Sequence, residues 1–245
     1  MSLRAANWKV SSRKACRVRS AIRSRLMARQ NEHGKLIATA AKAALLPLSC
    51  RRKGQSRCWF SDERFWCIFI EFQPSAWSRG TYLNVSPVWF FLEGWGGEAA
   101  HRLGNYIEFE SVQQFGPLIE EAAQLVAAEV VALRVKFHTL ADIHRFFAGN
   151  LAWSGNVYRA AITAGLVGDV ALARQLFARI KGLDPSKHGI LLKDRQAECA
   201  ALAALLDDPQ AYRLAIRERI EVRRRARGWP PDPHCIEAMQ LDRIG

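Results

Sequence analysis

Histidine and cysteine, the residue types that most often bind metals or carry catalysis, do not occur in this sequence at the spacings that such sites use. The six cysteines are Cys16, Cys50, Cys58, Cys67, Cys199 and Cys235. No two of them form a Cys-x-x-C pair, so neither a zinc site nor a redox pair is indicated. The closest two histidines, His138 and His144, are six residues apart and do not lie on one metal-binding turn. We therefore expect no metal site, and reduced thiols in a reducing, cytoplasmic compartment.

No complete catalytic or cofactor-binding motif is present. The segment Gly94-Trp95-Gly96-Gly97 lacks the lysine and hydroxyl residue of a phosphate-binding loop and the third glycine of a dinucleotide fingerprint, so it predicts a turn. Because no nucleophile elbow, zinc-protease or paired-carboxylate motif appears either, we expect no cofactor. An enzyme would need groups distant in the sequence to converge. The polar residues that the predicted sheet and the helix after it would contribute are Glu71, His101, Glu108 and Glu110.

Basic residues are the most numerous candidates for binding a partner. The 245 residues include 36 Lys and Arg against 23 Asp and Glu, a net charge of +13. A basic run over residues 51–53 precedes an aromatic segment, and residues 209–227 are rich in arginine. Either group suits an acidic protein surface, and a basic run beside aromatic rings also suits single-stranded nucleic acid. Alternatively, the cations cover a turn and a solvated helix face. The candidate binding residues are Arg51, Arg52, Lys53, Arg217, Arg223, Arg224 and Arg225.

The first 26 residues account for most of the excess charge. They contain eight Lys and Arg and no Asp or Glu, which leaves 28 cations against 23 anions, or +5, for residues 27–245. Three interpretations stay open: an arm that binds phosphates, an organellar transit peptide, or sequence that precedes a true start at Met27. We expect residues 1–28 to be a disordered basic segment or to lie before the true start.

Hydrophobic periodicity predicts an α+β domain over residues 29–150. Apolar residues at spacings of three and four favour a helix over residues 31–48, which Pro47 ends or kinks. Aromatic and β-branched residues then predict three antiparallel strands within residues 58–91 and a fourth at residues 106–109. A long helix with Pro117 in its first turn follows. The expected architecture is a small antiparallel sheet packed on flanking helices.

The predicted strands differ in their expected burial. Apolar residues on both sides of residues 65–72 indicate a strand that is covered on both faces. Residues 82–89 alternate apolar and polar positions, which predicts a half-buried strand. Stretches without a charged residue reach only 13 positions, as in residues 80–92. Since this is too short for a spanning helix, we expect no membrane segment.

Residues 151–245 are predicted to be helical throughout. A helix pair is expected at residues 156–165 and 170–181, with Gly168 in the turn and Asp169 as the N-cap of the second helix. A further helix opens at Asp207 or Asp208 and runs towards Arg227. Because strands come first and helices afterwards, the order favours α+β with an all-helical C-terminal region over a doubly wound sheet.

Residues 168–185 resemble the second half of a tetratricopeptide repeat. Alanine, phenylalanine and proline occur at the corresponding offsets, as Ala173, Phe177 and Pro185. No second copy follows at a period of 34 residues, so the simpler interpretation is a plain helical hairpin. In either case the pair buries Ala173 and Phe177 and presents a surface to another protein.

Residues 30–150 resemble an uncharacterised family of small bacterial proteins. The resemblance rests on Leu46-Pro47-Leu48, the basic run Arg51-Arg52-Lys53-Gly54 and Trp59, followed by the aromatic strands. Members of that family open with a helix ending in Leu-x-Pro-Leu-Gly-Phe, then a basic run, a glycine and an aromatic strand; here Ser49-Cys50 take the place of Gly-Phe. The resemblance implies a bacterial cytosolic α+β domain and supplies no active-site residues.

The sequence as a whole favours a non-catalytic module for protein–protein interaction. This hypothesis rests on three observations: the absence of catalytic motifs, the repeat-like helices, and an arginine-rich helix suited to an acidic surface. Nucleic-acid binding through the basic groups is the alternative, and an enzyme with converging polar groups is the third hypothesis. The identity of the partner and the oligomeric state are left open.

Overall fold

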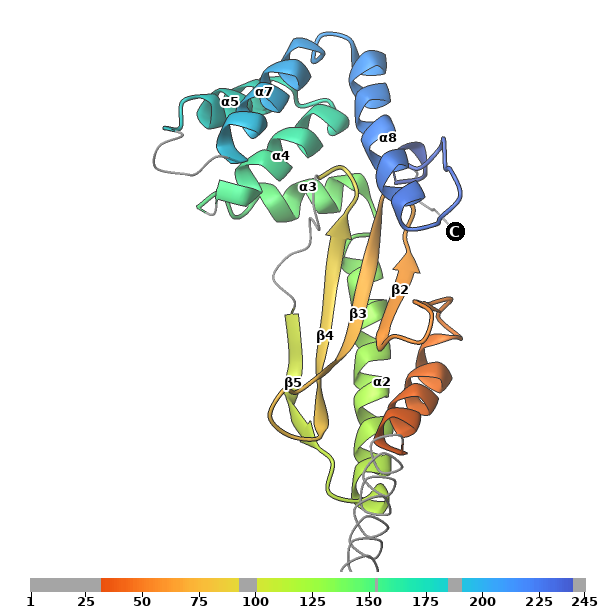
Figure 1. The fold of residues 1–245 in the computed structure, drawn as a ribbon. Coiled ribbons are helices and arrows are strands. Elements are labelled where there is room, and N and C mark those ends of the chain that lie inside the picture. The colour runs from red at the N-terminus through yellow and green to blue at the C-terminus, as the bar shows by residue number, and fades with distance from the viewer. Residues whose placement is uncertain (1–31, 93–100, 153, 185–190, 240–245) are drawn as a thin grey trace, which may run out of the picture. The chain divides into compact units, whose positions relative to one another are not determined.

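A computed structural model describes residues 32–92, 101–152, 154–184 and 191–239 (Figure 1). A five-stranded antiparallel sheet comes first and helices follow it, so the predicted α+β class with a helical C-terminal region is confirmed. The strands are hydrogen-bonded in chain order from β1 to β5. They are β1 (Arg51–Arg52), β2 (Cys58–Asp62), β3 (Trp66–Pro74), β4 (Gly80–Trp89) and β5 (His101–Glu108). The basic segment 1–28, the glycine segment 94–97 and Pro185 lie outside the described residues.

The helices account for most of the remaining described chain. A helix over residues 32–45, here called the N-terminal helix, precedes the sheet. The others are α2 (Val112–Lys136), α3 (Leu140–Ala148), α4 (Ser154–Val167), α5 (Val170–Lys181), α7 (Leu191–Ala204), α8 (Pro209–Ala226) and a 3-10 turn (Glu237–Met239). None of these described helices has both the length and the apolar character needed to cross a membrane.

The chain divides into two compact units that do not follow chain order. The first unit takes the chain up to Trp59, together with Ile70–Asn84 and Arg102–Ala127. The second takes Phe60–Phe69, Val85–His101 and the chain from Ala128 onwards. Strands β2, β3, β4 and β5 and helix α2 therefore each contribute residues to both units. Residue 150, at which the sequence predicts the end of the α+β domain, belongs to the second of these units.

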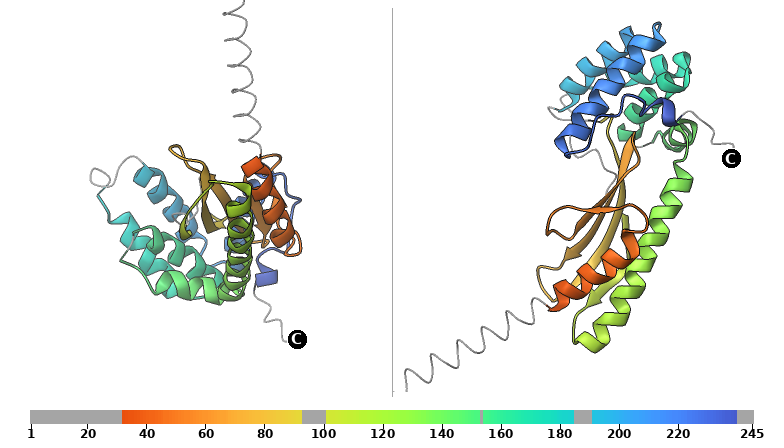
Figure 2. Two further views of the ribbon diagram at one scale, coloured as in Figure 1. Left: turned by 90° about the horizontal axis from the view of Figure 1, so that it is seen from below. Right: turned by 90° about the vertical axis from the view of Figure 1, so that its right-hand side faces the viewer.

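In the first unit, the N-terminal helix packs its apolar stripe inwards. Ile37, Ala41 and Leu45 are at most 2% exposed, and the helix ends two residues before Pro47, as predicted. The ring of His33 lies 5.6 Å from that of Phe115, near the start of α2. The N-terminal helix thus runs beside the first part of α2 (Figure 2).

Helix α2 begins at Val112, five residues before the proline expected in its first turn, so that prediction for Pro117 is wrong. The hydroxyl of Ser111 accepts a hydrogen bond from the N–H of Gln114 (3.1 Å), and the side chain of Gln114 accepts one from the N–H of Glu110 (3.3 Å). Ser-x-x-Gln is a helix-capping pattern, and here it outweighs the preference of proline for the first turn.

Strand β4 is more buried than its alternating pattern predicts. Asn84 and Ser86 lie on the polar face of this strand, which the half-buried pattern predicts to be exposed, but they are only 4% and 2% exposed. The amide of Asn84 donates to Gln73 Oε1 (2.8 Å) and Glu71 Oε2 (3.2 Å) on β3. The neighbouring strand therefore both satisfies and covers this polar group. On β3, the face formed by Trp66, Ile68, Ile70 and Phe72 is buried throughout. On the opposite face only Cys67 is buried, so the prediction that both faces are covered is wrong for that face.

In the second unit, α3 packs on α4, α4 on α5 and α5 on α7, while α8 also packs on α4. The predicted caps are confirmed: Asp169 Oδ1 accepts the N–H of Leu172 (3.0 Å), and Asp208 caps the start of α8. Ala173 and Phe177 are buried between the helices, as the hairpin interpretation requires. Helices α3 and α7 were not predicted individually.

Candidate functional site

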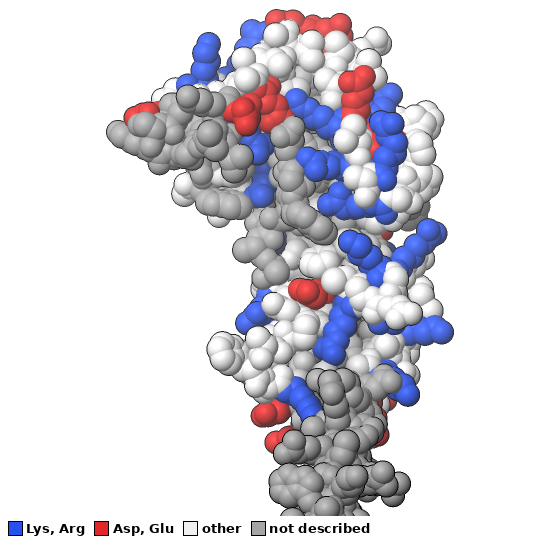
Figure 3. All heavy atoms as spheres, in the orientation of Figure 1, with Lys and Arg blue, Asp and Glu red and all other residues white. Residues whose placement is uncertain are grey.

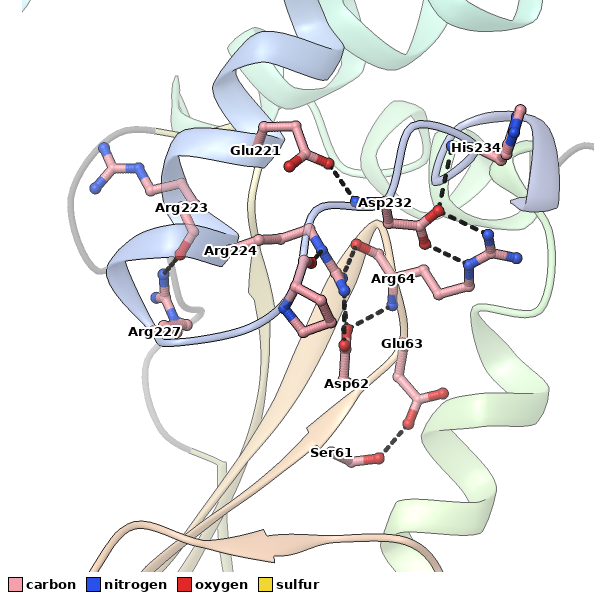
Figure 4. A network of polar contacts seen from close by, with 11 residues as sticks. Ser61, Asp62, Glu63, Arg64, Glu221, Arg223, Arg224, Arg227, Asp232 and His234 are labelled. Atoms are coloured by element: carbon pink, nitrogen blue, oxygen red, sulfur yellow. Dashed lines mark hydrogen bonds and ion pairs between the residues drawn. The ribbon is translucent and has the colours of Figure 1, made fainter.

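Arg224, one of the candidate binding residues, is buried within the second unit. Its side chain is 3% exposed. Its Nη1 and Nη2 donate to the two carboxylate oxygens of Asp62 at 2.6 and 2.8 Å (Figure 4). It also donates to the carbonyl oxygens of Arg64 (2.9 Å) and Pro230 (3.1 Å). The prediction that Arg224 binds an acidic partner is corrected, because internal acceptors already occupy its donors.

The same network attaches the segment after α8 to the turn between β2 and β3. Arg64 donates from Nε and Nη2 to the carboxylate of Asp232 at 2.5 and 2.8 Å. Glu221 Oε1 accepts the N–H of Asp232 at 2.6 Å (Figure 4). The hydrogen bonds from Arg64 hold the pKa of Asp232 below its usual range and raise the pKa of Arg64. These contacts indicate a structural role.

A cavity of about 320 Å³ lies beside this network in the second unit. Its charged lining residues include Asp62, Glu63, Arg64 and Arg134. Arg134 Nε donates to Glu63 Oε1 at 2.8 Å, and the other two belong to the contacts above. The charges around this cavity therefore neutralise one another, and none points to a ligand.

Two of the five remaining arginines of α8 also form ion pairs with acidic residues. Arg217 pairs with Glu237 at 2.6 Å, and Arg219 pairs with Glu198. Around α8, Lys and Arg side chains lie beside Asp and Glu side chains rather than forming an unbroken basic patch (Figure 3). Of the candidates on α8, Arg223 is half-buried and Arg225 is exposed.

The basic run over residues 51–53 forms the edge strand β1 and the turn after it. Arg52 donates from Nε to the carbonyl of Ser56 (2.6 Å) and from Nη2 to that of Gln55 (2.8 Å), so it closes this turn. Arg51 and Lys53 are exposed. The structure therefore assigns Arg52 a local structural contact and leaves Arg51 at the surface.

The polar residues considered for an enzyme do not assemble into a catalytic cluster. Glu71 accepts a hydrogen bond from Asn84, while Glu108 and Glu110 are exposed. His101 belongs to the second unit. Among the described residues, no group of three His, Cys, Asp or Glu side chains could hold a metal ion. This part of the chain gives the enzyme hypothesis no geometric support.

A cavity of about 500 Å³ in the first unit, at the β3–β4 hairpin, was missed from the sequence. His33, Arg57 and Arg79 line it, with hairpin residues 74–80 and no Asp or Glu. Nη1 of Arg57 is shielded from solvent without a hydrogen-bond partner, and burial lowers the pKa of Arg57. Trp77 in the hairpin is 96% exposed. A large aromatic residue within a polar turn was the local signal that could have marked this site.

The outer face of α2 is the second feature that sequence reasoning missed. Leu118, Leu125, Val131 and Val135 are 42%, 48%, 46% and 72% exposed. Leu118 and Leu125 lie close together around the helix axis, and Val131 and Val135 lie roughly 110° away from them. Of the ten exposed large hydrophobic residues in the described chain, five lie on α2. The signal was present in the sequence, because α2 carries large apolar residues outside its buried stripe as well as within it.

Comparison with known proteins identifies no relative. The chain matches no protein-family model, no curated protein and no solved structure.

Proposed function

We propose that this protein is a non-catalytic module for protein–protein interaction, and that its partner is a second copy of the chain bound through the outer face of α2. The observation that carries the proposal is the group of exposed apolar residues on α2, of which Leu118, Leu125 and Val135 form one stripe. Contiguous apolar patches on soluble proteins mark interaction sites, and an apolar helix face is a common docking element.

The spacing of this stripe suits a helix pair. Six positions of α2, among them Leu118, Leu125 and Val135, recur at alternating intervals of three and four residues, which is the a/d pattern of two packed helices. They are Leu118, Glu121, Leu125, Ala128, Ala132 and Val135, and all of them except Glu121 are apolar. Val131 is exposed beside this set and is not one of its positions. The two alanines lie in adjacent turns and allow the helix axes to approach closely, since the interaxial distance depends on the side chains at the contact.

The charges along α2 favour an antiparallel pair with two-fold symmetry. Glu121 lies towards the N-terminal end of the stripe, and Lys136 is exposed at its C-terminal end. Antiparallel pairing about the midpoint between Leu125 and Ala128 places Leu118 against Val135 of the second copy. It places Glu121 against Ala132, one helical turn from Lys136. Parallel pairing would instead place Glu121 against its own copy, which is repulsive.

The other parts of the functional hypothesis have less specific support. The described cysteines form no disulfide, which agrees with the cytoplasmic location that belongs to this proposal. A bacterial origin, from the family resemblance, is likewise part of the proposal. Nucleic-acid binding is the less supported alternative, because Arg217 and Arg224 are engaged with Glu237 and Asp62.

The test is the oligomeric state of the full chain, measured by analytical ultracentrifugation over a concentration series. We expect a monomer–dimer equilibrium, and Leu125→Glu should weaken it by roughly tenfold or more because a charge replaces a central apolar contact. Leu214→Glu is the matched control: Leu214 is 51% exposed on α8, away from the stripe, and its substitution should leave the dimer unchanged.

The orientation is tested by exchanging charges. Glu121→Lys and Lys136→Glu should each weaken the dimer, and the double variant should restore it, because the pair is reversed rather than removed. A wild-type chain that stays monomeric throughout the series would overturn self-association. A dimer that persists in the Leu125→Glu variant would place the interface elsewhere. Loss of the dimer in the Leu214→Glu variant would do the same.

A further inference from the structure

The cavity at the β3–β4 hairpin points to a function separate from the outer face of α2. We propose that this cavity binds a small oxyanion ligand, a phosphate or carboxylate group, between the guanidinium groups of Arg57 and Arg79. Both residues line the same cavity of about 500 Å³, together with His33, Ser75, Trp77 and Ser78. All these residues belong to the first unit, so the site is complete within it.

Arg57 supplies the main argument. Its Nη1 is shielded from solvent and has no hydrogen-bond partner, while its Nη2 lies 3.5 Å from His33 Nε2. No carboxylate pairs with Arg57 or Arg79 among the described residues, and no Asp or Glu precedes Glu32 in the sequence. A guanidinium group that is partly desolvated and unpaired is costly, and an anion would supply the missing acceptors in a bidentate geometry.

The cavity lining otherwise carries neutral donors and no opposing charge. Ser75 Oγ accepts the N–H groups of Trp77 (3.1 Å) and Ser78 (3.3 Å), which leaves the hydroxyl proton of Ser75 able to donate. The indole of Trp77 is 96% exposed, so it can stack on a planar group attached to the anion. These features suit a phosphate or carboxylate carried by an aromatic molecule.

The backbone beside the cavity is closely packed at Gly80. A Cβ at Gly80 would lie 2.1 Å from the carbonyl oxygen of Ile107 and 2.5 Å from the hydroxyl of Tyr106, so only glycine lets the hairpin approach β5 this closely. The carbonyl oxygen of Gly80 lies 3.3 Å from His33 Nε2. Because one ring nitrogen cannot donate to this carbonyl and accept from Nη2 of Arg57 at the same time, His33 lies against both groups and hydrogen-bonds to one of them.

The test is isothermal titration calorimetry of the full chain with four probes. Inorganic phosphate and acetate separate the two oxyanion sources, while adenosine monophosphate and neutral adenosine measure the contribution of an aromatic group. We expect at least one of the two anions to bind, in roughly the millimolar range or tighter. We expect adenosine monophosphate to bind more tightly than phosphate, and adenosine alone to bind weakly.

Variants separate this site from general attraction to a basic protein. Arg57→Gln should weaken binding of the anion by roughly tenfold or more, because a charge-assisted pair is lost. Lys42→Gln is the control, since it removes one positive charge from an exposed position on the N-terminal helix. Trp77→Ala should weaken adenosine monophosphate and leave phosphate unchanged. If Arg57→Gln unfolds the chain, as circular dichroism would show, Arg79→Gln takes its place.

Three results would overturn the proposal. The first is that none of the anions binds. The second is that Arg57→Gln and Arg79→Gln bind as tightly as the wild type. The third is that Lys42→Gln loses as much affinity as Arg57→Gln, which would indicate diffuse attraction to the net positive charge. The cavity contains no residue of α2, so anion binding can be measured whether or not the chain forms a dimer.

Discussion

The second unit buries Arg224 against a carboxylate, whereas the first unit half-buries Arg57 against none in the described chain. Arg224 has the carboxylate of Asp62 at 2.6 and 2.8 Å and two carbonyl acceptors besides. Arg57 has a shielded nitrogen without an acceptor and a pKa lowered by burial. Burying a charge is tolerable when hydrogen bonds and an opposite charge compensate for lost water, and is unfavourable otherwise.

This difference separates arginines that hold the fold from arginines that suit a ligand. Substitution of Arg224 or of its carboxylate should therefore affect stability. Substitution of Arg57 should leave stability nearly unchanged while it affects binding, because binding sites commonly retain groups that the fold alone does not favour.

The largest effect is expected at the Asp62–Arg224 pair. Asp62→Ala leaves a guanidinium that is 3% exposed without its carboxylate, so we expect a loss of about 3–5 kcal/mol in the free energy of unfolding. Arg224→Ala should cost less, because Asp62 is 31% exposed and can regain water. Urea denaturation followed by circular dichroism measures both changes.

Arg225→Ala is the matched control for this pair. Arg225 is adjacent in sequence to Arg224 but exposed, so we expect a change within about 0.5 kcal/mol. The double variant Asp62→Ala with Arg224→Ala should recover part of the loss, since no unpaired charge stays buried. Equal losses in Arg224→Ala and Arg225→Ala would contradict the structural role of Arg224.

The second-largest effect is expected at Asp232, whose carboxylate should make the free energy of unfolding depend on pH. The hydrogen bonds from Arg64 lower the pKa of this carboxyl in the folded protein, so its contribution is fully present above the usual aspartate value of about 3.9 and is lost as the pH falls below it. Because Arg64 is 41% exposed and water screens the pair, we expect Asp232→Asn to cost no more than about 1 kcal/mol at neutral pH.

The measurement compares the free energy of unfolding of wild type and Asp232→Asn from neutral pH down to about pH 3. The difference between the two should shrink below the usual aspartate pKa, because the wild type loses the contribution that the variant already lacks. A difference that stays constant over this range would show that the charge of Asp232 does not stabilise the fold.

Elements with complete local signals were predictable from the sequence. Helix α5 occupies the expected residues 170–181, because Asp169 caps its start and a single apolar stripe fixes its face. The predicted start of α2 was wrong because it relied on Pro117 and did not consider the capping pair Ser111 and Gln114. The burial of Asn84 was not predictable from β4, because the groups that cover it come from β3.

The sites were harder to predict, because their partners are distant in sequence. Arg224 and Arg225 look alike locally, and the acceptor that distinguishes them, Asp62, is 162 residues away from Arg224. The helical phase nevertheless held a signal: Arg224 continues the spacing of four set by the buried residues Ile216 and Ile220. Extending that stripe by one turn would have placed Arg224 on the buried face.

The smallest effect, and the sharpest contrast with Arg224, is expected at Arg57. Arg57→Met keeps the apolar stem and removes the charge. It therefore removes the cost of burying the guanidinium, the same burial that lowers the pKa of Arg57. It breaks no ion pair among the described residues. We expect the free energy of unfolding to rise slightly or to change by less than about 0.5 kcal/mol, as measured by the same urea titration. A loss similar to that of Arg224→Ala would mean that Arg57 stabilises the hairpin, and the distinction between a fold-holding and a ligand-binding arginine would fail. An unchanged stability, together with lost anion binding, would show that the first unit keeps this charge for its ligand.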